Sequence, residues 1–369
     1  MKAKITKQGI IYSCNVGPFR YQGWPTVTID ENGVLYAAWS GHRVSHIDPF
    51  GMDLMSISRD NGETWSAPMI VNDSWLDDRD AGLCYLGNGK MILSWFNHEA
   101  NAYLTRYNER VLKATDEYNY GIVKGMLDAY ADFTEEMDTW GGHIRISENY
   151  GQTWSEPIKV PVKAPHGPVY TKSKRLLFVG DGFDIKDVDE RSQLPIKLYE
   201  SPDEGRSWEY LSTIPWPQEY ATNILSEPYL VELADGRLLV AVRLETNNPY
   251  TMYFCYSSDG GKTWTDPKMS NISGAPPHFR TLSDGSIILT YGRREKPMGI
   301  RAVISKDGFE TWSEEIELTD EITPKSRGDL GYGSTVELPD GQLLTVHYQP
   351  VGNGDITSIV YTKWEKPEI

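Results

Sequence analysis

The octapeptide Ser58-Arg59-Asp60-Asn61-Gly62-Glu63-Thr64-Trp65 occurs in five versions along the chain. The other versions begin at Ser147, Ser201, Ser257 and Ser305, and together they follow the pattern S-x-D-x-G-x-T-W. Asn149 replaces the aspartate in the second version, and the glycine of the fifth, Gly308, stands one place early. Recurrence of one motif at such intervals indicates a repeat protein.

The residue types of this motif are those of a tight turn between two strands. Aspartate or asparagine can hydrogen-bond the backbone just ahead of it, and glycine supplies a positive φ. Threonine and tryptophan then begin the next strand with a large apolar anchor. One such unit cannot bury its own hydrophobic face, so several units must stack radially.

The motif is similar to the Asp-box, or BNR, repeat, and the chain resembles the sialidase superfamily. The resemblance covers nearly all of the sequence. It implies an all-β fold, a six-bladed β-propeller of sialidase type, in which each box joins the third and fourth strands of a blade. In that family the boxes lie at the rim away from the active site, so the box residues are expected to be structural.

Composition narrows the classes of partner. The chain has 369 residues and a formal net charge of −16, which disfavours nucleic acid and anionic membranes. An anionic substrate would therefore need a local cluster of arginines. The three cysteines, Cys14, Cys84 and Cys255, are far apart and are expected to be reduced thiols.

The chain carries no recognisable targeting or cofactor motif. Its start, MKAKITKQGIIYSCNVGP, has no apolar core of signal-peptide length, and no apolar run is long enough to span a membrane. We therefore expect a cytoplasmic protein. Histidines at metal-binding spacing, a phosphate loop and a dinucleotide fingerprint are all missing, so neither a metal nor a cofactor is expected.

Strands and turns follow one order throughout, so we expect residues 1–369 to form a single propeller domain. The N-terminal strand, residues 3–13, is expected to close blade 6 together with residues 331–364. The first two boxes are unusually far apart, and apolar residues within 98–142 recur at helical spacing. This segment is expected to be a small helical insertion in blade 2. It could line a pocket, form an oligomer contact or be a decorating loop, and the sequence leaves a homo-oligomer open.

Functional residues of a propeller lie where the innermost strands and their loops meet the axis. Matched residue by residue, the resemblance implies that Tyr332 is the nucleophile, Glu227 its partner and Asp48 the general acid. It implies that Arg43, Arg243 and Arg301 bind the substrate. Topology and chemistry add three further candidate substrate contacts, namely Arg79, Asp80 and His278.

Structural roles compete with these assignments. Glu227 and Arg243 can form an ordinary ion pair between strands, Tyr332 can be a core aromatic, and Asp48 can be a turn residue before proline. One position departs from the family pattern. Its first triad arginine lies in an F-R-I-P-like segment, but this chain has Gly23 at that place, in Gln22-Gly23-Trp24-Pro25. Arg20, Arg43 or Arg79 could supply the charge, or the substrate is not an ordinary sialic acid.

The expected function is that of an exo-glycosidase acting on a terminal acidic sugar of a glycan. A neutral tyrosine activated by a glutamate avoids repulsion by a carboxylate at the anomeric carbon, and sialidases use tyrosine in this way. Two alternatives remain open. One is a hydrolase or lyase of uronic-acid glycans, which the Gly23 departure favours. The other is a non-catalytic glycan-binding propeller.

Overall fold

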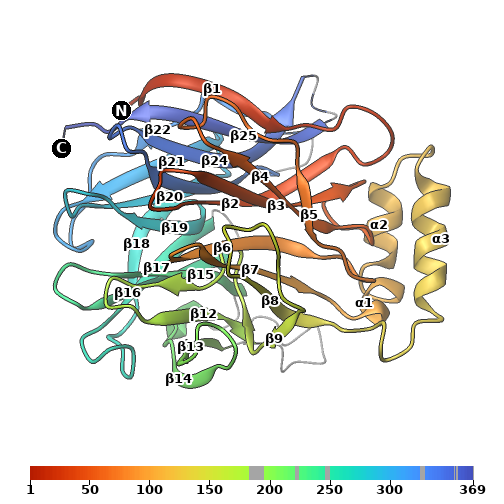
Figure 1. The fold of residues 1–369 in the computed structure, drawn as a ribbon, viewed down its shortest axis with the longest axis horizontal. Coiled ribbons are helices and arrows are strands. Elements are labelled where there is room, and N and C mark those ends of the chain that lie inside the picture. Colours follow the sequence, from red (N-terminus) through yellow and green to blue (C-terminus); the bar gives the residue numbers. More distant parts are fainter. Residues whose placement is uncertain are drawn as a thin grey trace.

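The computed structural model describes residues 1–182, 195–220, 224–245, 250–324, 329–352, 354 and 356–368. Six antiparallel sheets follow one another along the chain (Figure 1). Their innermost strands contact the next sheet in turn, and the last contacts the first, so the sheets close into a ring. The all-β fold and the six-bladed propeller predicted from the sequence are confirmed.

The first three blades hold the N-terminal half of the chain. Blade 1 consists of β2 (Tyr21–Ile29), β3 (Leu35–Arg43), β4 (Met52–Ser58) and β5 (Met69–Asn72). Blade 2 consists of β6 (Arg79–Gly87), β7 (Lys90–Asn97), β8 (Gly141–Ser147) and β9 (Ile158–Val160). Blade 3 consists of β10 (Val162–Lys163), β11 (Val169–Tyr170), β12 (Leu176–Gly182), β13 (Ile196–Ser201) and β14 (Glu209–Thr213).

A short 3₁₀ helix, η2 (Gln218–Tyr220), leads into the other half. Blade 4 consists of β15 (Ile224–Glu232), β16 (Leu238–Glu245), β17 (Tyr250–Ser257) and β18 (Lys268–Ser273). Blade 5 consists of β19 (Ala275–Thr281), β20 (Ile287–Arg293), β21 (Gly299–Ser305) and β22 (Ile316–Glu317). Blade 6 consists of β23 (Gly331–Glu337), β24 (Leu343–Val351), β25 (Ile356–Glu365) and β1 (Lys4–Tyr12).

The two ends of the chain meet in blade 6. Strand β1 pairs antiparallel with β25, with Lys4 opposite Glu365 and Gly9 opposite Tyr361. Figure 1 accordingly shows the N- and C-termini near each other. The fourth strand of this blade, β1, comes from the N-terminus, whereas the other three come from the C-terminal part of the chain. The hydrogen bonds between β1 and β25 therefore close the ring.

The five Asp boxes form the turns between the third and fourth strands of blades 1–5. In each, the first serine's Oγ accepts a backbone N–H four residues on, at 2.7–2.9 Å. The tryptophan of each box packs against a different inter-blade core. In the fifth box Phe309 takes the left-handed position that glycine holds in the others, with φ 65°. Its ring is fully buried, so packing compensates for the unfavourable backbone.

Replacing Asp60 by alanine should lower the free energy of unfolding by roughly 1 kcal/mol, because the turn loses hydrogen bonds but lies at the surface. Asp60 accepts the Thr64 hydroxyl at 2.6 Å and the Thr64 N–H at 2.9 Å. These bonds lower the pKa of Asp60 from 3.8 to about 2. The contribution of Asp60 to the free energy of unfolding is therefore complete above about pH 4, and it declines as the pH falls toward 2. Urea unfolding at neutral and acidic pH measures this, and an equal loss at both would contradict it.

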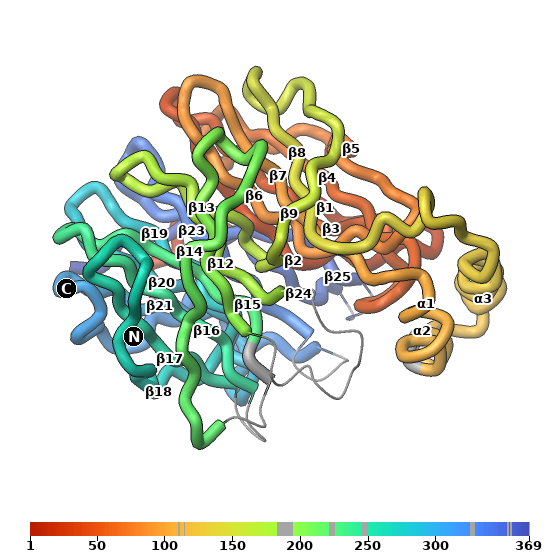
Figure 2. Tube along the Cα trace, turned by 90° about the horizontal axis from the view of Figure 1, so that it is seen from below, coloured from red at the N-terminus to blue at the C-terminus, as the bar shows by residue number. Residues whose placement is uncertain are grey.

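The helices α1 (Ala100–Leu104), α2 (Asn108–Ala114) and α3 (Tyr120–Tyr130) lie between β7 and β8, within the predicted insertion. They stand at one edge of the molecule in Figures 1 and 2. Val123 and Leu127 of α3 belong to a core that includes Phe50 and Leu76, from the loops after β3 and before β6. The insertion thus supports the loops that carry part of the candidate site. No helix among the described residues is long and apolar enough to cross a membrane.

Candidate functional site

A β-bulge at one shared position shapes five innermost strands. The strands are β2, β6, β15, β19 and β23. Between two paired positions, each of them advances by three residues while its partner strand advances by two. The flanking positions are Gly23 and Thr26, Arg79 and Gly82, Ser226 and Tyr229, Ala275 and His278, and Gly331 and Ser334. A bulge redirects side chains and is enriched beside active sites.

Four of these bulges hold a non-glycine residue with positive φ. The residues are Trp24, Asp80, Glu227 and Tyr332, with φ between 51° and 56°. Such a backbone is uncommon for side chains of this size, and it concentrates at functional sites. Because the bulges occupy the same place in these five blades, their residues meet around the propeller axis. This recurrence marks the candidate active site.

Tyr332, Glu227 and Arg243 form the centre of the site. The Tyr332 hydroxyl donates to Glu227 Oε1 at 2.7 Å, and Arg243 forms an ion pair with Glu227 Oε2. Burial alone would raise the pKa of Glu227, but Arg243, Arg294 and the Tyr332 hydrogen bond outweigh it, so that pKa is lowered. Burial raises the pKa of Tyr332 well above 10, and the charge of Glu227 adds to the rise. A neutral phenol therefore faces an ionised carboxylate.

Arg294 joins this centre, although the sequence reasoning did not select it. Its guanidinium lies 5.7 Å from the Tyr332 ring centroid and 5.0 Å from that of Tyr250. Among the described residues it makes no ion pair, and its Nε is buried without a hydrogen-bond partner. One feature of the sequence could have identified it. Gly292 pairs with Ala275 at the edge of the blade-5 bulge, as Arg243 pairs with Ser226 at the edge of the blade-4 bulge. Side chains two residues apart on a strand share a face, so Arg294 lies on the same face as Gly292.

Asp80 is the acid whose environment suits proton transfer near neutral pH. Its side chain is buried, and its Oδ1 has no hydrogen-bond partner among the residues that the structure describes. Burial raises the pKa of Asp80 to about 7 against the opposing charge of Arg79, and the charge of Glu227 adds to the rise. The carboxyl group is thus partly protonated at neutral pH, with a free oxygen.

Arg43 and Arg79 are held by an aspartate that sequence reasoning missed. Arg43 donates twice to Asp77, with its Nη2 at 2.9 Å from Oδ2, and its side chain is fully buried. Arg79 Nη1 lies 3.3 Å from the same oxygen. Both guanidinium groups stack on Trp24, 4.7 and 4.3 Å from its ring. Arg43 is therefore sealed away from a substrate, contrary to the expectation that it would bind one, while Arg79 borders the site.

Trp24 lies where the family's first arginine was sought. The sequence comparison placed Gly23 there, but the bulge makes Trp24 the residue equivalent to Glu227 and Tyr332. Its ring lies 6.5 Å from that of Tyr332 and is almost fully buried. An apolar ring thus stands in place of a cation, and neither neighbouring arginine is free to replace that charge.

Asp48 is a turn residue and not a free acid. Its Oδ2 accepts the backbone N–H of Val44 and of Ser45, each at 2.7 Å. Its Oδ1 accepts the N–H of Phe50 at 2.9 Å, and the side chain is fully buried. Both oxygens are thus bound to the backbone of its own loop, although burial raises the pKa of Asp48. The general-acid role expected of Asp48 stays a prediction, and this geometry does not favour it.

Arg301 is tied to the backbone around it. Its Nη1 donates to the carbonyls of Ile300 and Thr319 at 3.0 and 3.3 Å, and its Nη2 donates to Pro297 at 3.1 Å. The side chain is 1% exposed and also pairs with Glu315. Every contact of its nitrogens is internal, so it does not join Arg243 as a substrate-binding residue, as had been expected.

His278 belongs to the core of the ring and not to a sugar-binding surface. Its Nδ1 accepts the Thr335 N–H at 3.3 Å, and its Nε2 lies 3.1 Å from Ser334 Oγ. Its ring stacks on Tyr229, and burial lowers the pKa of His278 well below 6.5. Both ring nitrogens are used between blades, so the expected substrate contact is not made.

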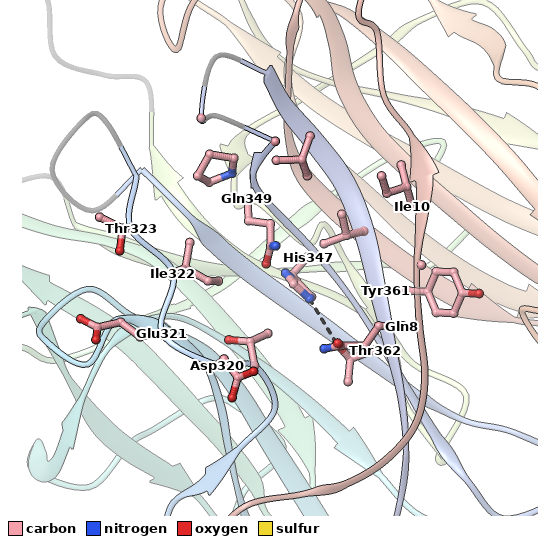
Figure 3. Close-up of a pocket in the computed structure, with 17 residues that line it drawn as sticks. Gln8, Ile10, Asp320, Glu321, Ile322, Thr323, His347, Gln349, Tyr361 and Thr362 are labelled. Carbon is pink, nitrogen blue, oxygen red and sulfur yellow. Dashed lines mark hydrogen bonds between the residues drawn. The ribbon is translucent and has the colours of Figure 1, made fainter.

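A separate cavity of about 680 Å³ lies between residues 319–323 and strands β24, β25 and β1 (Figure 3). His347 and Gln349 point toward it from β24, and His347 Nε2 lies 3.5 Å from Thr362 Oγ1. Its lining includes none of the residues selected from the sequence. No group of three or more His, Cys, Asp or Glu side chains in the described part of the chain could hold a metal ion.

The Asp boxes and the six-bladed ring together define a β-propeller of BNR repeats. More particularly, it belongs to the BNR repeat-like domain family, whose model matches residues 118–344. The BNR/Asp-box repeat model matches residues 56–67. The comparison with curated proteins found no match.

Several solved structures share the fold. A protein of unknown function from Dyadobacter fermentans is 22% identical, with 99% of both chains covered and a TM-score of 0.78. The NanB sialidase from Streptococcus pneumoniae is 16% identical, with a TM-score of 0.69. The alignment covers 97% of this chain and 70% of the NanB chain. The intramolecular trans-sialidase from Ruminococcus gnavus is 15% identical, with 98% of both chains covered and a TM-score of 0.65. At these identities the likeness establishes the fold.

Proposed function

We propose that the protein is an exo-glycosidase that hydrolyses a terminal acidic sugar, with Tyr332 as nucleophile and Glu227 as its base. The observation that carries the proposal is the 2.7 Å hydrogen bond from the Tyr332 hydroxyl to Glu227 Oε1. As the phenolic oxygen bonds to the anomeric carbon, its proton passes to Glu227. A neutral nucleophile is not repelled by an acidic group on the sugar.

Arg294 and Arg243 would bind the acidic group of the sugar. Arg294 is the better placed, because it makes no ion pair among the described residues. Arg243 already pairs with Glu227 and Glu245, so its main effect is to keep Glu227 ionised. A guanidinium can hold a carboxylate through two parallel hydrogen bonds, which fixes the orientation of the sugar as well as its position.

Asp80 would act as the general acid in place of Asp48. Its protonated carboxyl would give a proton to the leaving oxygen as the glycosidic bond breaks, and the resulting carboxylate would then activate water against the glycosyl–tyrosine bond. The free Oδ1 and the pKa of about 7 support this role. Asp80 is also held at a bulge, as Glu227 and Tyr332 are, so all three side chains would approach the substrate from one ring.

Replacing Asp80 by asparagine should lower kcat/KM by about 10²–10⁴-fold for a substrate with a poor leaving group. The loss should be smaller for an activated aryl glycoside, whose leaving group needs no proton. In the wild type, kcat/KM should fall as the pH rises through about 7, since the protonated acid is then lost. The variant should lack that decline. An unchanged alkaline limb in the variant would contradict the role of Asp80.

The function is tested by fluorophore release from an α-sialoside, with the neutral glycoside that lacks the carboxylate as the matched control. Turnover of the sialoside alone would support an enzyme selective for acidic sugars. Equal turnover of both would contradict the role of the two arginines. If the wild type turns over neither the sialoside nor a uronide but binds glycans, the protein is a binding propeller and the proposed catalysis is wrong.

A uronic-acid glycan is the second substrate class, and a specific observation favours it. Trp24 occupies the position equivalent to the other site residues, and Asp77 holds both Arg43 and Arg79. Two arginines, Arg243 and Arg294, are thus proposed to bind the acidic group, whereas sialidases rely on three. A uronide places its carboxylate away from the anomeric carbon, so it would need a different arrangement of cations. Higher kcat/KM for a uronide than for an α-sialoside would favour this class.

A further inference from the structure

A second cavity, of about 320 Å³, lies where the innermost strands β2, β6, β11, β15 and β19 end. Glu227 is near the start of β15, whereas Tyr229 and Glu232, further along the same strand, line this cavity. The corresponding bulges open the other strands, so the cavity lies at the opposite end of the ring from the Tyr332–Glu227 site. Arg280, the penultimate residue of β19, and Lys172 line it.

Arg280 is a partly buried cation that lies near carboxylates without forming an ion pair within the described part of the chain. Among the described residues it makes no hydrogen bond and no ion pair. The carboxylates nearest in the fold are already engaged. Glu232 accepts the Ser173 N–H at 2.9 Å, and Glu337 accepts the Ser283 hydroxyl at 2.7 Å. Burial lowers the pKa of Arg280, against the opposing influence of Tyr229, Glu337 and Cys84.

A partly buried guanidinium without a bonded acceptor is unfavourable, because burial removes part of its hydration and no protein oxygen replaces that water. The neighbours that share the cavity, Tyr229 and Cys84, are neutral, since burial raises the pKa of both. In a chain of net charge −16, such a cation would be easy to pair with a carboxylate. The fold leaves it exposed to the cavity instead.

We propose that this end of the ring binds a small anion at Arg280. A carboxylate or a phosphate fits the guanidinium, which offers parallel donors to two oxygens, and Lys172 at the rim adds a second positive charge. The volume is at the lower limit for ligand sites, so the ligand is an ion or a small organic acid and not an oligosaccharide. The proposal is independent of the glycosidase function.

Inorganic phosphate and acetate serve as probes, at constant ionic strength, with the full chain. Calorimetric titration should detect binding, and thermal unfolding should shift to higher temperature with the bound anion. Arg280→Met should weaken binding by about 10–100-fold. Without anion, the same variant should unfold at a higher temperature than the wild type, because the unpaired charge is gone. Arg59→Met removes the same charge from an exposed position and should change neither property.

Two results would overturn the proposal. One is a wild type that binds neither phosphate nor acetate, and the other is an Arg280→Met variant that binds them as the wild type does. If Arg280→Met does not fold, Arg280→Lys provides the test. It keeps the charge but loses the paired donors, so it should bind both anions more weakly than the wild type. Binding of only one probe would identify the chemistry of the ligand. Loss of glycosidase activity in the Tyr332 variant should leave anion binding unchanged, which separates the two sites.

Discussion

Tyr332→Phe is expected to reduce kcat/KM for the acidic glycoside by at least about 10³-fold, since residues that act as a catalytic unit lose most of their effect together. Phenylalanine keeps the ring, which packs 5.8 Å from that of Tyr348, but removes the oxygen that would attack the sugar. Glu227 would keep its ion pair with Arg243. The site should therefore stay assembled while the nucleophile is missing.

Steady-state kinetics of the purified variant measure this loss, and thermal unfolding verifies that it is folded. Tyr253→Phe is the matched control, because Tyr253 is fully buried in blade 4 and its hydroxyl has no hydrogen-bond partner in the described part of the chain. That variant should keep full activity. Comparable turnover by Tyr332→Phe and the wild type would exclude Tyr332 as nucleophile and leave the Tyr332–Glu227 contact a structural one.

Asp77→Asn is expected to lower the free energy of unfolding by about 3–5 kcal/mol, because it leaves two buried guanidinium groups without their carboxylate. Asp77 is fully buried and bonds to Arg43, Arg79 and the Tyr103 hydroxyl, the last at 2.6 Å. Tyr103 comes from α1, so the same carboxylate joins the insertion to the propeller. Its loss should also loosen the helices.

Urea unfolding gives the magnitude, and helical circular dichroism reports on the insertion. Asp128→Asn removes a carboxylate of an exposed pair with Lys124 and should change stability by less than about 1 kcal/mol. A loss for Asp77→Asn as small as that of the control would mean that the two arginines find other partners. Arg43 would then be available to a substrate after all.

Trp24 connects these two predictions. It contacts Tyr332 on one side and both arginines on the other. The ring covers the two guanidinium groups that Asp77 holds and stands beside Tyr332, the proposed nucleophile. Under the proposed function, the sugar would meet an apolar ring where the sialidase pattern has an arginine. This constraint is the physical basis for testing uronides beside sialosides.

Local sequence determined the blades. The bonds within an Asp box join residues no more than four positions apart, as between Asp60 and Thr64 or Ser257 and Gly261, so each box can be recognised in eight residues. Helical spacing likewise indicated the insertion. Order along the chain, together with the family resemblance, selected Glu227 and Tyr332, and the structure brings this pair into contact across 105 residues.

Tertiary structure alone decided which charged residues are free. Asp48 and Arg301 have the expected residue types at the expected places, but nearby backbone groups take their oxygens and nitrogens. Among the described residues, Asp80 Oδ1 and Arg294 Nε are buried without a hydrogen-bond partner. The one-residue bulges also put Trp24, and not Gly23, beside Tyr332. Spacing fixes which residue types approach the axis, whereas burial and long-range hydrogen bonds decide which of them can act.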